Sequence, residues 1–136
     1  MEIMGLLDSS YVFSLNRVEG ALYGGYAGDL PETVSVPHIT SSKILVSNNA
    51  FKDDQYGVYL DATFESGATC QVVSNDFQNI TNIGIYLGTG TSHCIVAGNT
   101  ETTIQNLGTD NVIVNTGKGM YAAKSGCTIA LKKDKS

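Results

Sequence analysis

The sequence predicts an all-β solenoid, in which short parallel strands stack coil upon coil with little or no helix. Three observations predict it: a motif recurs about every 25 residues, the repeating runs are β-branched and aromatic, and no segment beyond Met4–Leu7 has helical periodicity. A unit of this length cannot bury its own apolar face, so it must stack on its neighbours. Equivalent residues of successive coils are then expected about 4.8 Å apart.

The first half of the repeat is an apolar run that leads to an asparagine. The run Val46–Phe51 resembles Val72–Phe77, and Val96–Asn99 continues the series, which places the asparagines at Asn49, Asn75 and Asn99. We predict that these asparagines form an internal ladder at a turn, because Asn tolerates the left-handed backbone and stacked amides bond along the ladder. A polar sugar-binding row is the functional alternative.

Alternation assigns the side chains around these asparagines to the inside or the outside of the coil. The side chains of the first strand expected to point inward are Ile44, Cys70, Cys94, Val46, Val72 and Val96. Leu45, Gln71 and Ile95 are expected to point outward. Phe51 and Phe77 are expected to stack on each other inside the coil.

The second half of the repeat is a tyrosine-containing strand. The run Tyr56–Leu60 resembles Ile83–Leu87, and Asp110–Val114 is interpreted as a third copy of the same strand. The side chains expected to point inward are Val58, Leu60, Ile85, Leu87, Val112 and Val114. Those expected to point outward are Tyr59, Tyr86 and Ile113, with Leu22 as a further member of this outer row.

The whole chain, 1–136, is expected to be a single domain of about five coils. Residues 1–42 are interpreted as an irregular N-terminal coil or cap, 43–116 as the regular coils and 117–136 as a C-terminal cap and tail. A weak copy of the repeat occurs at 16–23. The glycine-rich segment Tyr23–Gly28 lacks the Lys-Ser/Thr ending of a phosphate loop and is interpreted as a connection between coils.

The patterns V-x-N-x-F and G-[VI]-Y-L resemble the right-handed parallel β-helix, or pectin-lyase-like, group over about residues 43–116, and loosely over 10–42. This resemblance implies a right-handed coil. It also implies an extracellular, cell-surface or virion-associated location, and it allows a trimer. Enzymes of the group are polysaccharide lyases and glycoside hydrolases, so the resemblance implies an acidic polysaccharide as the substrate of an enzymatic alternative.

The catalytic candidates of that alternative are Asp53, Asp54 and Asp61, because glycoside hydrolysis needs two carboxyl groups flanking one bond. Of the residues that mark polygalacturonases, only the paired aspartate is present. Neither His38 nor His93 lies between glycines, and no basic pair flanks an isoleucine. Calcium binding by the three aspartates remains open, but no loop signature supports it, and no cofactor or metal is assigned.

The outward tyrosines Tyr59 and Tyr86 are the ligand-binding candidates, with Gln71 as a polar contact. Three interpretations of this row stay open: stacking on sugar rings, a subunit interface, or a surface covered by a terminal segment. Cys70 and Cys94 occur at repeat spacing and are interpreted as buried thiols, with a disulfide between them as the alternative.

Charge and hydropathy exclude two classes of partner. The net charge is -5, and Arg17, Lys43 and Lys52 are the only basic residues before Lys118, so a nucleic-acid partner is not expected. No apolar run approaches the ~18 residues of a membrane span. The sequence therefore favours a non-catalytic module, structural or carbohydrate-binding, from a larger surface, secreted or phage-tail-type protein. Its expected partners are a polysaccharide, copies of itself, or neighbouring domains of a parent chain.

Overall fold

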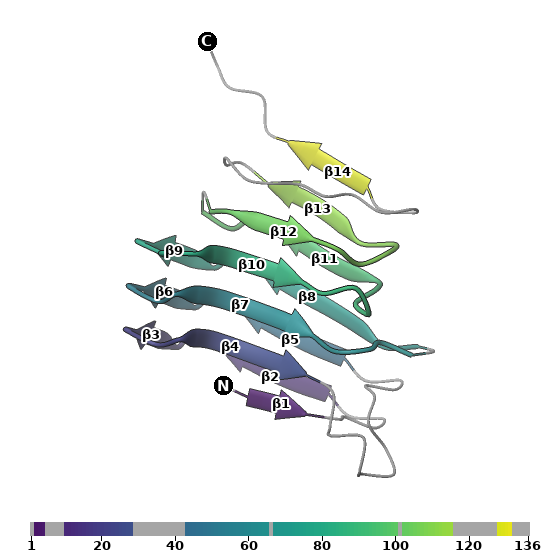
Figure 1. The fold of residues 1–136 in the computed structure, drawn as a ribbon, viewed down its shortest axis with the longest axis horizontal. Coiled ribbons are helices and arrows are strands. Elements are labelled where there is room, and N and C mark those ends of the chain that lie inside the picture. The colour runs from purple at the N-terminus through teal and green to yellow at the C-terminus, as the bar shows by residue number, and fades with distance from the viewer. Residues whose placement is uncertain are drawn as a thin grey trace.

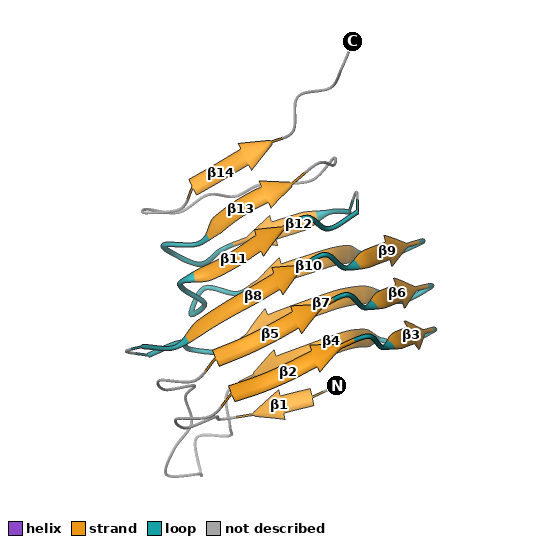
Figure 2. Ribbon diagram, turned by 180° about the vertical axis from the view of Figure 1, so that it is seen from behind, coloured by secondary structure: helices purple, strands orange, loops and turns teal. Residues whose placement is uncertain are grey.

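The fold was analysed in a computed structural model, which describes residues 2–4, 10–28, 43–65, 67–100, 102–115 and 128–131. None of these residues is helical, and every strand pairs in parallel with its neighbours. The strands form three sheets that run up a solenoid, with the two larger sheets facing each other and the third along one side (Figures 1 and 2). The predicted all-β parallel β-helix is confirmed.

Each sheet collects the equivalent strands of successive coils. The five-stranded sheet contains, in spatial order, β1 (Glu2–Met4), β4 (Tyr23–Gly28), β7 (Tyr56–Asp61), β10 (Ile83–Leu87) and β12 (Ile104–Asn106). The six-stranded sheet contains β14 (Thr128–Leu131), β13 (Val112–Asn115), β11 (Cys94–Ala97), β8 (Thr69–Val73), β5 (Lys43–Ser47) and β2 (Ser10–Ser14). The three-stranded sheet contains β3 (Arg17–Glu19), β6 (Ala50–Lys52) and β9 (Asp76–Gln78).

The core is made of columns of identical or similar side chains, as the repeat predicts. In the six-stranded sheet, Ile44 pairs with Cys70 and Cys70 with Cys94, and in the next column Val46 pairs with Val72 and Val72 with Val96. The side chains of both columns are almost fully buried: Ile44, Val46, Cys70, Val72, Cys94 and Val96. The outward assignment of Leu45, Gln71 and Ile95 also holds, since these three are partly or largely exposed.

The predicted asparagine ladder is present at the bend between the six-stranded and three-stranded sheets. Asn49 Nδ2 donates to Asn75 Oδ1 at 3.0 Å, and Asn75 Nδ2 donates to Asn99 Oδ1 at 3.0 Å. Asn16 extends the ladder by one coil through a 3.2 Å bond to Asn49 Oδ1. The left-handed backbone lies one residue before each ladder position, at Leu15, Asn48, Ser74 and Gly98, and not at the ladder asparagines themselves.

A second internal stack, made of phenylalanine rings, explains the glycines at positions 24 and 57 of two tyrosine strands. Phe51 and Phe77 stack with ring centroids 5.2 Å apart, as predicted. The ring of Phe51 lies against Gly24, and the ring of Phe77 lies against Gly57, where any Cβ would overlap the ring. Glycine is therefore required at these positions so that the rings can fill the corner of the coil.

Two sequence assignments are wrong. Asp110–Val114 does not continue the tyrosine strands, because β13 pairs with β11 in the six-stranded sheet. Ile113 is consequently buried, while Val112 and Val114 are exposed. The true continuation of the tyrosine strands is β12, in which Ile104 pairs with Ile85. The segment between Asn99 and Ile104 is too short to include a strand of the three-stranded sheet. Every later residue therefore reaches its position in the coil earlier than a constant repeat length predicts.

The glycine-rich segment Tyr23–Gly28 is also not a connection between coils. It is β4, which pairs with β7 through Tyr23–Tyr56 and Tyr26–Tyr59. Together with β2 and β3 it makes residues 10–28 a regular coil that bonds to the next one residue for residue. The expected C-terminal cap at 117–136 and Cys127 lie outside the described residues, apart from β14, which pairs with β13.

Candidate functional site

Five tyrosines cover the outer face of the five-stranded sheet. Tyr26, Tyr59 and Tyr86 occupy one register position on β4, β7 and β10. Their rings stack with centroid distances of 5.9 and 4.3 Å and interplanar angles of 12° and 10°. Tyr59 and Tyr86 therefore stand side by side on the outer face, and the row extends to Tyr26 rather than to Leu22 or Ile113.

A second, shorter stack lies beside this row. Tyr23 and Tyr56 are in register, with ring centroids 5.2 Å apart and an angle of 24° between the planes. The two stacks meet at Tyr59, which lies edge-on to Tyr56 at 79° and is tilted by 57° against Tyr23. Tyr23, Tyr26 and Tyr56 were not predicted from the sequence, although the motif Tyr-Gly-x-Tyr occurs twice, 33 residues apart.

The stacking direction decides which part of each ring meets solvent. The rings of Tyr26, Tyr59 and Tyr86 stack along the solenoid axis, so each inner face is covered by the next ring. Ring edges and hydroxyl groups are left for a ligand. Burial, followed by the neighbouring Tyr86 and Asp61, raises the pKa of Tyr59 to about 12, so this phenol is a neutral hydrogen-bond donor at physiological pH.

Asp61 lies at the end of β7, next to the tyrosine row. It is exposed, and its register partner on β4 is Gly28. Its Oδ1 atom lies over Gly88, where a Cβ would overlap it, and the hydroxyl of Tyr26 lies over Gly28. The absence of a side chain at Gly88 thus makes room for the Asp61 carboxylate itself, and its absence at Gly28 makes room for the Tyr26 hydroxyl. The five strands of this sheet contain no Lys, Arg or His.

The other two catalytic candidates lie at the opposite end of β7, before Tyr56. Asp53 is exposed, and its Oδ1 accepts a 2.7 Å hydrogen bond from Asn79 Nδ2. Asp54 is fully buried, and its Oδ1 accepts a 2.7 Å bond from the backbone N–H of Ala21. Asp54 Oδ2 has no hydrogen-bond partner among the described residues, and burial raises the pKa of this carboxyl group.

The structure does not bring Asp53, Asp54 and Asp61 together. The five residue steps of β7 alone span about 16 Å, and Asp61 stands at the far end of them. Paired glycosidase carboxyl groups stand about 5 to 9.5 Å apart. Among the described residues, no group of three or more His, Cys, Asp or Glu side chains is placed to hold a metal ion.

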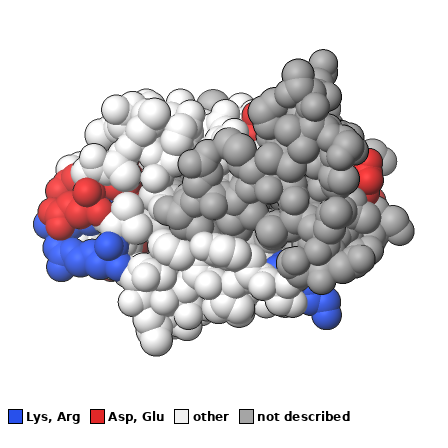
Figure 3. Space-filling model, turned by 90° about the horizontal axis from the view of Figure 1, so that it is seen from below, with Lys and Arg blue, Asp and Glu red and all other residues white. Residues whose placement is uncertain are grey.

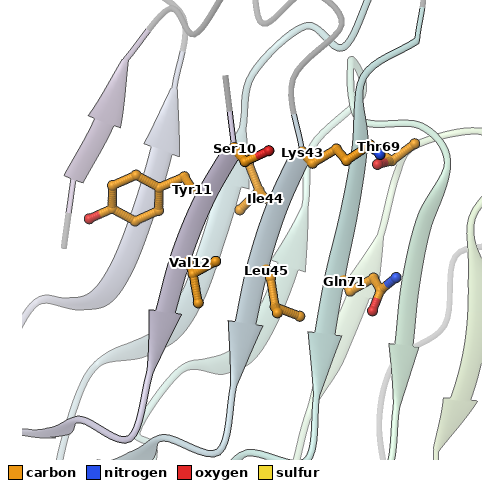
Figure 4. A pocket seen from close by; sticks show the side chains of 8 residues that line it. All are labelled: Ser10, Tyr11, Val12, Lys43, Ile44, Leu45, Thr69 and Gln71. Atoms are coloured by element: carbon orange, nitrogen blue, oxygen red, sulfur yellow. The ribbon is translucent and has the colours of Figure 1, made fainter. Parts of the chain in front are cut away.

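Gln71 lies on the six-stranded sheet and not beside the tyrosines. It points outward in register with Leu45, which is in register with Val12, and the three side chains follow one another along a shallow groove (Figure 4). The groove has a volume of about 250 Å³ and is also lined by Ser10, Lys43 and Thr69. Four outward side chains of this sheet are large, apolar and exposed: Val12, Ile95, Val112 and Val114.

The two described cysteines are buried free thiols on neighbouring strands, as one interpretation of the sequence predicts. Cys70 and Cys94 are register partners, and each is at most 1% exposed. Burial, together with the neighbouring Cys70 thiol, raises the pKa of Cys94 well above its usual value. Both side chains lie in the hydrophobic core and contribute to its packing.

Charged side chains gather along the side of the molecule that carries the three-stranded sheet. Seen from below, acidic and basic groups meet there (Figure 3). Glu19 pairs with Arg17 at 3.2 Å and with Lys52 of the next coil at 3.8 Å. These side chains are partly exposed, so the pairs contribute little to stability. No helix within the described ranges is long and apolar enough to cross a membrane.

These observations define the class of protein: a parallel β-helix in which tyrosines cover the outer face of the five-stranded sheet. The family model for the right handed beta helix region matches residues 3–101. The chain therefore belongs to the right-handed β-helix family. No curated protein and no solved structure matches it.

Proposed function

We propose that this chain is a non-catalytic β-helix module that binds carbohydrate on the outer face of the five-stranded sheet. The observation that carries the proposal is the cluster of five half-buried tyrosines on three consecutive strands. Tyrosine is amphipathic and has few rotatable bonds, so it offers contact area and hydrogen bonds at a low entropic cost.

The tyrosines are held in place before any ligand arrives. Each ring of the cluster contacts at least one other ring at a centroid distance of 5.9 Å or less, and the strands beneath them are tied in register. A rigid site loses little side-chain entropy on binding, which favours affinity. Hydroxyl groups in a row offer repeated hydrogen bonds to a repeating polymer, with about 4.8 Å between coils.

The positions of the three aspartates support a non-catalytic role. Asp54 is inaccessible to a polymer, Asp53 is engaged with Asn79, and Asp61 lies at the far end of β7 from both. A glycosidase needs an acid and a second carboxyl group across one bond, with pKa values that differ. We expect no release of reducing ends or unsaturated products from pectin, alginate or neutral glucans.

Native affinity electrophoresis in gels that contain single polysaccharides tests the proposal. We expect at least one polysaccharide to retard the protein, and the Tyr59→Ala, Tyr86→Ala double variant to lose at least tenfold in affinity. The variant Tyr59→Phe, Tyr86→Phe keeps the rings and removes the hydroxyls, so a similar loss shows that hydroxyl groups carry the binding.

The matched control is Val12→Ala, which alters an exposed side chain on the six-stranded sheet and should bind like the parent protein. Circular dichroism establishes that each variant folds. Absence of retardation by every polysaccharide, or unchanged binding by the folded double-alanine variant, contradicts the proposal.

Self-association is a second candidate function, favoured by the exposed apolar side chains of the six-stranded sheet. Val12 is 60% exposed, and Ile95, Val112 and Val114 continue along the same face. Apolar surface of this kind is typical of interfaces between subunits. Light scattering after size-exclusion chromatography is expected to show a dimer or trimer that Val12→Asp with Ile95→Asp dissociates. A monomer at 100 µM would exclude this candidate.

A further inference from the structure

We infer that the tyrosine face selects neutral polysaccharides and rejects polyanionic ones such as polygalacturonate. This inference rests on the proposed function and adds the chemical class of the ligand. It is carried by the placement of Asp61 within the tyrosine face and by the composition of the five strands that form it.

The charge on this face has one sign. Asp61 is exposed at the edge of the tyrosine row, and it is the one charged residue in β4, β7, β10 and β12. None of the five strands contains a Lys, Arg or His, so these strands contribute no cation to the face. A uronate carboxylate that approached the row would meet Asp61 without a counter-charge, and like-charge contact is an effective way to reject a ligand.

The hydrogen-bonding groups on the face match sugar hydroxyls. A phenol such as that of Tyr59 donates and accepts, whereas the Asp61 carboxylate only accepts. Gln105, the register partner of Tyr86, continues the row with an amide that does both. A neutral sugar supplies hydroxyl donors for Asp61, which the carboxylate of a uronate lacks.

The stacked rings also determine how the ligand is held. Because neighbouring rings cover the inner faces of the Tyr26, Tyr59 and Tyr86 stack, a sugar ring contacts edges and hydroxyls instead of an open aromatic face. Binding then depends on hydrogen bonds, which makes the charge next to the hydroxyls decisive for selectivity.

The test is affinity electrophoresis of the full chain in two sets of gels at low and at physiological salt. One set contains hydroxyethylcellulose, xylan or glucomannan, and the other contains polygalacturonate or alginate. We expect at least one neutral polymer to retard the protein strongly and both anionic polymers to retard it only weakly, with the largest difference at low salt. Asp61→Asn should raise the affinity for polygalacturonate by about threefold, a typical effect for one exposed charge.

Asp53→Asn is the matched control. It makes the same change of charge at an exposed site beyond the other end of β7. Its left-handed backbone accepts asparagine, as the equivalent Asn79 shows. We expect it to leave both kinds of binding unchanged. An equal gain in Asp53→Asn and Asp61→Asn would overturn the local role of Asp61.

The outcomes separate this inference from the function on which it rests. Retardation by polygalacturonate as strong as that by any neutral polymer overturns the selectivity and leaves carbohydrate binding standing. No retardation by any polymer of either set overturns both. The parent protein alone decides between these two results, so the test does not depend on the folding of a variant.

Discussion

Two regions of the solenoid differ in how they turn the corner after the asparagine ladder. In the coils that contain β6 and β9, a phenylalanine fills the corner, and the chain makes a strand of the three-stranded sheet before it enters the tyrosine strand. In the coil after Asn99, Thr102 lies against Gly84 in place of a ring, and the chain passes directly to Ile104. The coil that has Thr102 at this corner is therefore narrower than the coils that have a phenylalanine there, because it contributes no strand to the three-stranded sheet.

The three-stranded sheet ends at β9, and the hydrogen-bonding groups at this edge are satisfied by a residue of the following narrow coil. The N–H of Phe77, which faces the position of a further strand, donates to Thr100 Oγ1 at 2.7 Å. Thr100 Oγ1 also contacts Asp76 Oδ1 at 3.2 Å. One threonine therefore satisfies the edge of β9, which would otherwise offer an unpaired strand edge.

The largest effect is expected when the filled corner is emptied. Phe51 is fully buried between Gly24 and the ring of Phe77, so Phe51→Ala should lower the free energy of unfolding by about 3–5 kcal/mol. Thr102→Ala in the narrow coil removes far less volume and should cost about 1 kcal/mol. Urea unfolding followed by circular dichroism measures both, and equal losses would mean that the two corners are not different.

The asparagine ladder joins the wide and narrow coils and should be the next most sensitive feature. Asn75→Ala removes bonds to Val46 and Asn99 and leaves the buried N–H of Asn49 without its acceptor. Several unsatisfied buried groups predict a loss of about 3 kcal/mol in unfolding free energy. Asn16→Ala, at the exposed end of the ladder, is the control and should cost 1 kcal/mol or less. Equal losses for the two variants would argue against a cooperative ladder.

A methyl group at the glycine against Phe77 should have a smaller effect. A Cβ at position 57 overlaps the ring of Phe77 and the carbonyl oxygen of Gly84, so Gly57→Ala should cost about 1–3 kcal/mol by overpacking. The control is Gly20→Asn. A Cβ at position 20 meets no other atom, and asparagine tolerates the positive φ of this residue better than alanine does, so we expect little loss of stability. A Gly57→Ala protein as stable as the parent would show that the Phe77 corner has room to adjust.

The sequence predicted the repeating part of the molecule well, since Ile44, Cys70 and Cys94 recur at one position and point inward as alternation requires. It failed where the period changed. Nothing in Asp110–Val114 reveals that the preceding coil has lost a strand, so a constant period of 27 residues placed this segment on the wrong sheet. The strand β4 was not predicted, because Gly24 and Gly25 occur in it and glycine usually weakens a strand. The glycine at position 24 is explained by the ring of Phe51, which packs against it.

The candidate site was predicted in part for the same reason. Tyr59 and Tyr86 lie in the regular coils, and their stacking followed from the repeat. Tyr23 and Tyr26 lay in the segment interpreted as a connection and were missed. The burial of Asp54 could not be predicted, since a Lys-Asp-Asp-Gln run is typical of an exposed turn. Its burial depends on the coil below, where Ala21 supplies a backbone N–H.

The smallest expected effect concerns the pH dependence of stability. It distinguishes the buried Asp54, which precedes β7, from the exposed Asp61 at the other end of this strand. Because burial raises the pKa of Asp54 in the folded state, the folded protein binds this proton more tightly than the unfolded chain. The contribution of Asp54 to stability is therefore full below the unfolded pKa of about 3.9 and is lost as the pH rises through the folded pKa. Asp54 thus makes the folded protein less stable at neutral pH than at a pH below about 3.9.

Asp54→Asn should be at least as stable as the parent protein at pH 7, because its amide oxygen can still accept from Ala21 and no charge is buried. The variant should also lose part of the parent's change in unfolding free energy between pH 4 and 7. Asp61→Asn, which changes an exposed carboxyl group at the other end of the strand, should retain that pH dependence. Urea titrations at pH 4, 5, 6 and 7 measure the difference, and parallel profiles for Asp54→Asn and the parent would show that Asp54 titrates as an ordinary exposed carboxyl group.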